Sequence, residues 1–243
     1  MNEKIKIKEN KDIAYFSSQS PKIKMKYPHI KDQSLQSKIF LKQEFQYKYD
    51  GEIKDLVEED KNGNLCSFKS FELNPHQQFV KRFLSHHTPY NGLLLYHGMG
   101  SGKTCSAIGI TEEFRKYNKY NENYKKIYII ASPNVQENFK LQLFDRSKLK
   151  NVNGLWNLEG CIGESLLMEM KNYNLEKLSE ESIVKKINRI INKNYVFIGY
   201  GQFANIIESI NDFEATNERS RKKIIKARLN SLFDGAMLVI DEA

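Results

Sequence analysis

The chain has 243 residues, of which 40% are apolar, and it carries a formal net charge of +8. This length suits one large domain, or one domain with an extension, and the apolar content is sufficient for a sizeable core. No apolar run approaches the roughly 20 residues that span a bilayer, and the lysine-rich N-terminus lacks the apolar centre of a signal peptide, so we expect no membrane segment. A basic chain attracts polyanions, usually nucleic acid, although an A·T-rich coding sequence would also raise the lysine content.

The three cysteines are Cys66, Cys105 and Cys161, an odd number at scattered positions. They form no pair with the spacing of a metal site, and their pattern predicts no disulfide framework. A reducing, intracellular setting is therefore expected.

Residues 1–70 are rich in lysine and modest in apolar content, which predicts an extension rather than a second domain. Short ordered pieces are expected at Ile39–Leu41 and Glu44–Phe45. Turns are expected at Tyr49–Gly51 and Lys61–Asn64 because they combine Gly with Asn or Asp.

From Phe71 onward the sequence predicts helices and strands in alternation, and we assign residues 71–243 to one domain. Asn74-Pro75 predicts a helix start, with Pro75 at its first position. Four strands are expected at Leu93–Tyr96, Ile127–Ala131, Tyr195–Tyr200 and Met237–Ile240. Helices are expected at Lys103–Tyr117, Asn134–Leu143, Ser182–Asn192, Gln202–Ile210 and Asn217–Phe233. Such alternation predicts an α/β fold with a mostly parallel, doubly wound sheet flanked by helices.

The span of about 145–194 is long for a single crossover between strands. We expect a helical insertion there, with turns at Asn153-Gly154 and Glu159-Gly160.

A glycine-rich stretch, His97 to Thr104, lies between the first predicted strand and the helix after it. This setting is typical of a phosphate-binding loop, because glycines let backbone N–H groups approach phosphate oxygens at a helix N-terminus. Lys103 would reach the phosphates and the Thr104 hydroxyl would hold Mg²⁺. His97 occupies the place of the first glycine in the full pattern, and a chance Gly-Lys-Thr is the alternative. The candidate nucleotide-binding residues of the loop are Gly98, Gly100, Ser101, Gly102, Lys103 and Thr104.

The sequence ends with four apolar residues, Met237–Ile240, followed by Asp241, Glu242 and Ala243. The pattern predicts a buried parallel strand with carboxylates at its C-terminal edge, where open α/β sheets bind ligands. Asp241 would contact Mg²⁺, and Glu242 would position and activate the attacking water. An exposed acidic pair after a core strand is the alternative.

Five further residues, in three parts of the sequence, are candidates for ligand contact. The amide of Gln77 can donate to and accept from an adenine edge at once; a solvated helix residue is the alternative. Ser132 and Asn134 follow the second predicted strand, and Gly201 and Gln202 follow the third. They could contact nucleic-acid phosphates, or serve only as ordinary helix caps.

A basic segment, Arg219–Arg228, is expected to be helical. A solvated helix face is the commoner explanation for such a charge run, and phosphate contact is the alternative.

Together these motifs resemble the first motor domain of superfamily II helicases, which has a RecA-like, P-loop nucleoside triphosphatase fold. The resemblance is to the type with a Gln motif, a Gly-x-Gly-Lys-Thr loop and an Asp-Glu-Ala-His box. Within this group, the sequence most resembles helicases of large DNA viruses, specifically poxvirus-type nucleoside triphosphatase I and the early transcription factor small subunit. The residues that carry this narrower likeness are Phe83–Ser85, Thr88–Tyr90, Gly92–Gly98, Leu155–Asn157, Gly160-Cys161, Gly199-Tyr200 and Phe203–Asn205.

The resemblance implies an ATP hydrolase of the helicase type that couples Mg²⁺-ATP hydrolysis to translocation or remodelling of DNA, with RNA as an alternative. Gln77 would read adenine, Lys103 and Glu242 would be catalytic, and Thr104 and Asp241 would organise Mg²⁺. The implied partners are a viral RNA polymerase or a second transcription factor subunit, in the virion or a viral factory in the host cytoplasm.

The sequence stops before the histidine of the box, so we expect an incomplete first motor domain without the second. An arginine finger from such a second domain is worth roughly 10³–10⁵ in rate. Residues 1–243 alone should therefore turn over ATP very slowly.

The alternative function is a DNA-binding transcription factor subunit that uses ATP as a switch. A P-loop kinase or ligase is disfavoured by the wide gap between Lys103 and Asp241.

Overall fold

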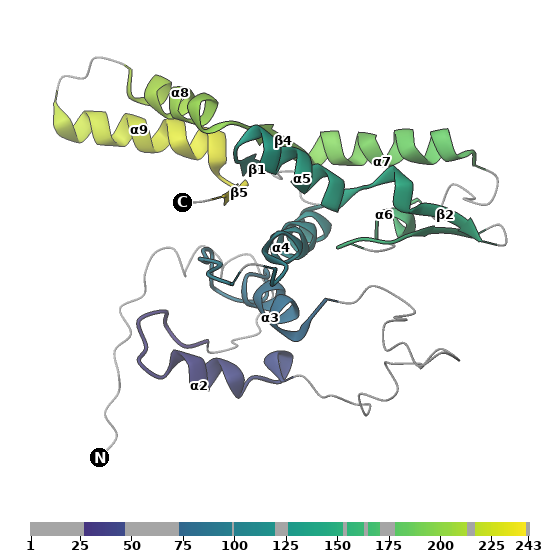
Figure 1. Ribbon diagram of the computed structural model, residues 1–243. Helices are drawn as coiled ribbons and strands as arrows, with labels where there is room; N and C mark the ends of the chain where they lie inside the picture. The colour runs from purple at the N-terminus through teal and green to yellow at the C-terminus, as the bar shows by residue number, and fades with distance from the viewer. Residues whose placement is uncertain are drawn as a thin grey trace.

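The computed structural model describes residues 27–46, 73–98, 100–119, 126–152, 155–162, 165–170, 178–212 and 217–241. Its centre is a three-stranded parallel sheet in the order β4-β1-β5 (Figure 1). The strands are β1 (Ile127–Ile130), β4 (Tyr195–Ile198) and β5 (Met237–Ile240). The predicted α/β class with a parallel sheet and flanking helices is confirmed.

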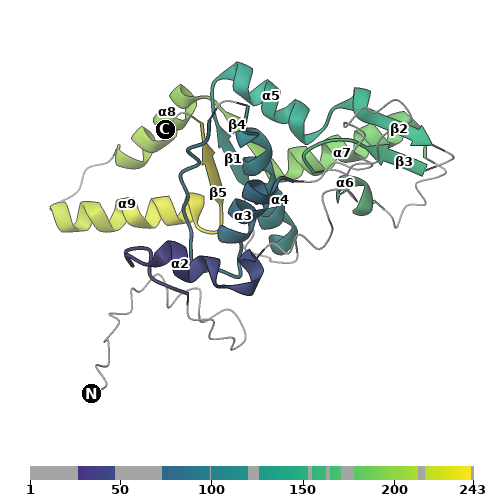
Figure 2. The same ribbon diagram turned by 60° about the horizontal axis from the view of Figure 1, so that its bottom comes forward.

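Helices lie on both sides of this sheet and at its two ends (Figures 1 and 2). Near one end, α8 (Tyr200–Asn211) and α9 (Glu218–Phe233) pack against each other. Beyond the other end lies α7 (Glu180–Asn194), and α5 (Pro133–Leu143) follows β1. All of these helices were expected from the sequence, with ends that differ by at most two residues.

The main core surrounds β1, because this strand has a neighbour on each side. Ile127, Ile129 and Ile130 are almost completely buried. Ile127 and Ile129 pack with apolar side chains from the helices, among them Ile108, Phe139, Leu143, Ile183 and Ile187. By contrast Leu238 and Ile240 of β5 are 37% and 46% exposed, so β5 is the less covered edge of the sheet.

The helix α4 (Lys103–Asn118) lies between the sheet and α3 (Pro75–Phe83), and it contacts both α3 and β5 (Figure 1). It begins directly after Gly102, whose φ of 79° is the left-handed conformation that glycine adopts without steric cost. The start of α3 follows the predicted pattern: Asn74 is the N-cap and Pro75 the first residue.

The described part of the N-terminal extension packs on α3. It contains α2 (Leu35–Phe40) and a short 3₁₀ helix, η1 (Gln43–Phe45), so the expected ordered pieces are confirmed. Ile39 and Phe45 form a second apolar cluster with Phe83 and Tyr90. The Tyr90 hydroxyl also donates to the carbonyl of Pro28 at 2.7 Å. The turns expected at 49–51 and 61–64 lie outside the described residues.

The insertion is not purely helical as predicted. After a 3₁₀ turn, η3 (Arg146–Lys148), strands β2 (Leu149–Val152) and β3 (Leu155–Leu158) form an antiparallel hairpin, which is followed by the short helix α6 (Ser165–Met168). Most residues of β2 are exposed, and β3 buries only Leu158. Neither strand therefore shows the alternation of apolar and polar residues from which a strand is predicted.

Two other expectations are wrong. The segment Leu93–Tyr96 pairs with no described strand, and it leaves Leu94 78% and Tyr96 93% exposed. A strand requires a neighbour for its N–H and C=O groups, and an apolar run cannot reveal whether one is present.

The second wrong expectation concerns the cysteines, whose pattern predicted no disulfide: Cys105 and Cys161 are joined in one. No helix in the described ranges is long and apolar enough to cross a membrane.

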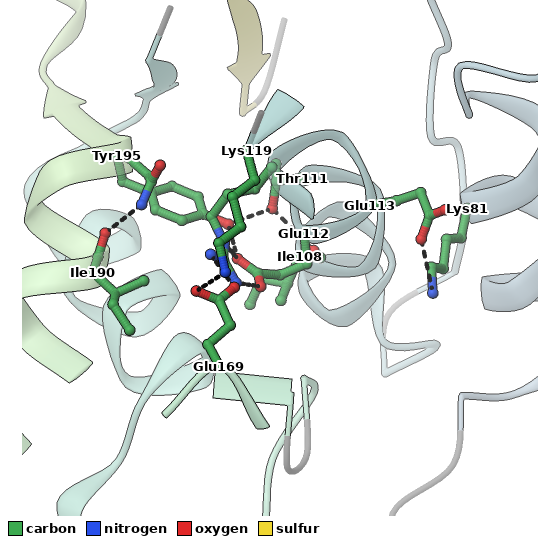
Figure 3. Close-up of polar contacts among 11 residues, drawn as sticks. Lys81, Ile108, Thr111, Glu112, Glu113, Lys119, Glu169, Ile190 and Tyr195 are labelled. Atoms are coloured by element: carbon green, nitrogen blue, oxygen red, sulfur yellow. Dashed lines mark hydrogen bonds and ion pairs between the residues drawn. The ribbon is translucent and has the colours of Figure 1, made fainter. Parts of the chain in front are cut away.

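A buried polar network fixes α4 to the sheet (Figure 3). The Tyr195 hydroxyl donates to Glu112 at 2.7 Å and lies 3.0 Å from the hydroxyl of Thr111. Arg115 binds Glu112 at 2.6 Å and Glu169 at 2.5 Å. Burial and the Glu112 charge raise the pKa of Tyr195, so its hydroxyl remains a donor. Burial alone would lower the pKa of Arg115, but both carboxylates together raise it, so the guanidinium remains charged.

Replacing Arg115 by Met should lower the free energy of unfolding by about 3–5 kcal/mol, because the buried Glu112 would lose its cation and Glu169 would keep only Lys119, at 3.8 Å. Urea unfolding measures this change. Lys116→Met is the matched control, since Lys116 is the exposed neighbour on the same helix. Equal stability of the two variants would contradict the role given to the network.

Candidate functional site

The C-terminal ends of the three parallel strands lie at one edge of the sheet. Ile130 of β1 is level with Ile198 of β4 and with Ile240 of β5. Beyond these residues, the Asp241 amide donates to the carbonyl of Ile130 at 3.0 Å. The Tyr200 hydroxyl donates to the carbonyl of Asp241 at 2.6 Å. Segments distant in sequence therefore end at the same place, which is where open α/β sheets bind ligands.

The glycine-rich loop leads into the first turn of α4. Gly100 and Gly102 have φ values of 75° and 79°, a conformation that side-chain-bearing residues rarely adopt. The Lys103 ammonium donates to the carbonyls of His97 and Gly98 at 3.0 and 3.1 Å. The ammonium thus bridges two carbonyls of the loop, and a phosphate that bound the ammonium would compete with these acceptors.

Two side chains of α3 hold this loop. The Gln77 amide donates to the carbonyl of Gly102 at 3.2 Å and accepts from the amide of Asn74 at 2.9 Å. Gln77 is only 3% exposed, so the alternative of a solvated helix residue is wrong. A ring nitrogen of His76 lies 3.0 Å from the carbonyl of Ser101. His76 was not among the predicted site residues, although it precedes Gln77 in the first turn of a helix that starts with Pro75.

The candidate metal ligands lie on two elements in contact. Thr104 is the second residue of α4, Asp241 follows β5, and α4 packs against β5. The Thr104 hydroxyl and the Asp241 carboxylate make no hydrogen bond to another described residue. Within the described ranges, no group of three or more His, Cys, Asp or Glu could hold a metal ion. Such a sparse oxygen set fits Mg²⁺, which keeps several waters and binds one or two protein ligands together with phosphates. Glu242 lies outside the described residues.

The candidate nucleic-acid residues flank the same edge. Ser132 is the N-cap of α5, yet its side chain makes no capping hydrogen bond, and Asn134 in the first turn is exposed. On α8, Gly201 is exposed, and the Gln202 side chain accepts from the Gly199 amide at 3.2 Å. Gln202 therefore does serve as a helix cap, whereas Ser132 and Asn134 present unused polar groups at the edge.

The link between α3 and the loop can be tested with two glutamine variants. Gln77→Ala should lower the local opening free energy by about 0.5–1.5 kcal/mol at residues 74–78 and also at 100–104, because the Gly102 carbonyl loses one of its donors and keeps only those of Ser106. Gln78→Ala, which removes a bond to the Leu73 carbonyl, should affect only the start of α3. Amide hydrogen exchange distinguishes the two, and unchanged protection of the loop in Gln77→Ala would contradict the link.

Comparison with known proteins relates the chain to viral helicases. A mimivirus protein named "Putative ATP-dependent RNA helicase" (Acanthamoeba polyphaga mimivirus) is 32% identical over 157 residues, which is 63% of this chain and 24% of that protein. A protein named "Putative helicase" from Invertebrate iridescent virus 3 is 27% identical over 187 residues, 72% of this chain and 16% of that protein. An early transcription factor large subunit homolog of African swine fever virus is 37% identical over 66 residues, 27% of this chain and 6% of that protein.

The chain thus spans about a quarter or less of the length of the relatives that it matches. No family model and no solved structure matches it. The expected similarity to viral helicases is confirmed. The narrower poxvirus-type assignment stays a prediction, and the transcription factor relative is a large-subunit homolog rather than the expected small subunit.

Proposed function

We propose that this chain carries the ATP-binding part of a superfamily II helicase-type ATPase that acts on nucleic acid. In this proposal the sheet is the RecA-like core of a first motor domain. The observation that carries the proposal is the contact between α4, which starts at the glycine-rich loop, and β5, which ends at Asp241. The similarity to proteins named as helicases supports it.

The loop would bind the triphosphate through its backbone N–H groups and through Lys103. On ATP binding, the Lys103 ammonium would exchange the His97 and Gly98 carbonyls for phosphate oxygens, which are better acceptors because they are charged. Thr104 and Asp241 would hold Mg²⁺, which neutralises developing charge on the phosphates. Glu242 would accept a proton from the attacking water.

Adenine recognition by Gln77 would require a rearrangement. Both ends of its amide are bound to backbone groups, of Asn74 and Gly102. Contact with adenine would release the Gly102 carbonyl, so base recognition would be coupled to movement of the loop.

The nucleic acid would lie along the sheet edge at Ser132, Asn134, Gly201 and Gln202, and ATP hydrolysis would drive translocation or remodelling. We propose DNA as the track, in viral transcription with a polymerase or a second factor subunit. The mimivirus relative is named as an RNA helicase, so RNA is the competing track. Parallel assays with single-stranded DNA and RNA discriminate between them.

A second candidate function is a nucleotide-switched transcription factor subunit with little turnover. The match to the early transcription factor homolog favours it. A motor would show ATP hydrolysis that rises with added nucleic acid, whereas a switch would change its nucleic-acid affinity with ATP and turn over little.

Lys103→Ala should weaken binding of Mg²⁺-ATP by about 10- to 100-fold, since charge-assisted hydrogen bonds contribute roughly 1.5–3 kcal/mol. Calorimetry measures the affinity, and circular dichroism should show an intact fold. Lys116→Ala removes the same charge near the other end of α4 and should bind like the parent. Parent-like binding by Lys103→Ala would disprove the assignment of the loop.

Glu242→Gln should preserve Mg²⁺-ATP binding and suppress hydrolysis, because the amide keeps the shape of the carboxylate but cannot accept a proton. An extended single-turnover assay is needed, since slow turnover is expected. Glu208→Gln, an exposed change on α8, serves as the control. Loss of binding with unaffected hydrolysis would contradict the proposed role.

A further inference from the structure

The disulfide joins the first turn of α4 to the segment that follows β3. Cys105 comes directly after Thr104, and Cys161 lies between β3 and α6. Their Cα atoms are 5.2 Å apart, within the about 4.4–6.8 Å range that a disulfide requires. The backbone therefore holds the two sulfur atoms ready to bond without any movement of the chain.

The surroundings of Cys161 also suit a free thiol. As a thiol, Cys161 can donate to the side-chain oxygen of Gln142 on α5, whose distance from the sulfur is 3.3 Å. Cys161 is 5% exposed and packs in the main core, where a small thiol is a common residue. We therefore infer that the pair can exist in both the reduced and the oxidised state.

The two sulfur atoms differ in accessibility. Cys105 is only partly buried. Cys161 is 5% exposed and enclosed in the main core. Cys105 is therefore the sulfur that an oxidant reaches, and Cys161 is the resolving partner.

We propose that Cys105 and Cys161 form a reversible thiol oxidation site that controls the glycine-rich loop, with a low-molecular-weight disulfide such as oxidised glutathione as the oxidant. The Cys105 thiolate attacks one sulfur of that disulfide and releases one thiolate, leaving a mixed disulfide. Cys161 then loses its proton and attacks the Cys105 sulfur, which releases the second thiolate. Two protein thiols are oxidised, one disulfide is reduced to two thiols, and the two protons pass to the leaving thiolates.

The cross-link would act on the loop because it fixes the residue next to Thr104. In the state that the structure shows, Lys103 is bound to the loop's own carbonyls. Oxidation ties the first turn of α4 to the Cys161 segment, whose Gly160 lies against α5. The tied turn resists the adjustment that phosphate binding requires, so oxidation should weaken ATP binding. This consequence rests on the proposed function, whereas the oxidation itself does not.

The test uses residues 1–243 with Cys66→Ser, which removes the third thiol. The protein is equilibrated in glutathione buffers of graded ratio, and free thiols are trapped and mapped by mass spectrometry. Binding of Mg²⁺-ATP is then measured in the fully reduced and fully oxidised forms. We expect a single two-electron transition that links Cys105 to Cys161, and at least a fivefold loss of ATP affinity on oxidation that dithiothreitol reverses.

Cys161→Ser in the same background is the control, because it should keep the reduced-state affinity and lose the response to oxidant. Absence of the Cys105–Cys161 bond in oxidising buffer would overturn the site itself. A bond that leaves ATP affinity unchanged would overturn the control of the loop. Absence of ATP binding in the reduced form would instead overturn the proposed function, even where the bond forms.

Discussion

The parallel pairing of β1 with both of its neighbours is the constraint on which the rest of the structure depends. Because Ile130 is level with Ile198 and Ile240, all three strands end at one edge, and the residues that follow them are brought together. The buried network of Tyr195, Glu112 and Arg115 then fixes α4 against this sheet. The glycine-rich loop at the start of α4 owes its position to that network as well as to the contact of α4 with β5.

The loop and α3 also depend on each other. A single buried amide, that of Gln77, caps α3 through Asn74 and binds the last residue before α4, Gly102. A Cβ at Gly102 would lie 2.3 Å from the amide nitrogen of Gln77, so that side chain would have to move, and the positive φ of Gly102 itself disfavours any other residue. If Gln77 binds adenine, this contact would therefore also change the conformation of the glycine-rich loop.

The sequence predicted those features that local chemistry determines. The bounds of β5 and the Pro75 start of α3 follow from an apolar run and from a proline after a capping residue. Features that depend on distant partners could not be predicted. The residues around Arg115 do not indicate its ion pair with Glu169, and those around Cys105 do not indicate its disulfide with Cys161. For the candidate site, the loop and Asp241 were predicted from motifs, whereas the contacts of His76 and Tyr200 are evident only from the structure.

The central claim is that the glycine-rich loop and the end of β5 bind one metal–triphosphate together. A double-mutant cycle with Thr104→Val and Asp241→Asn, scored by the affinity for Mg²⁺-ATP, tests it most directly. If both residues act through the same ion, the second substitution should cost little once the first is present, with a coupling of about 0.5–3 kcal/mol. Strictly additive losses, or an Asp241→Asn variant that binds Mg²⁺-ATP like the parent, would contradict the account.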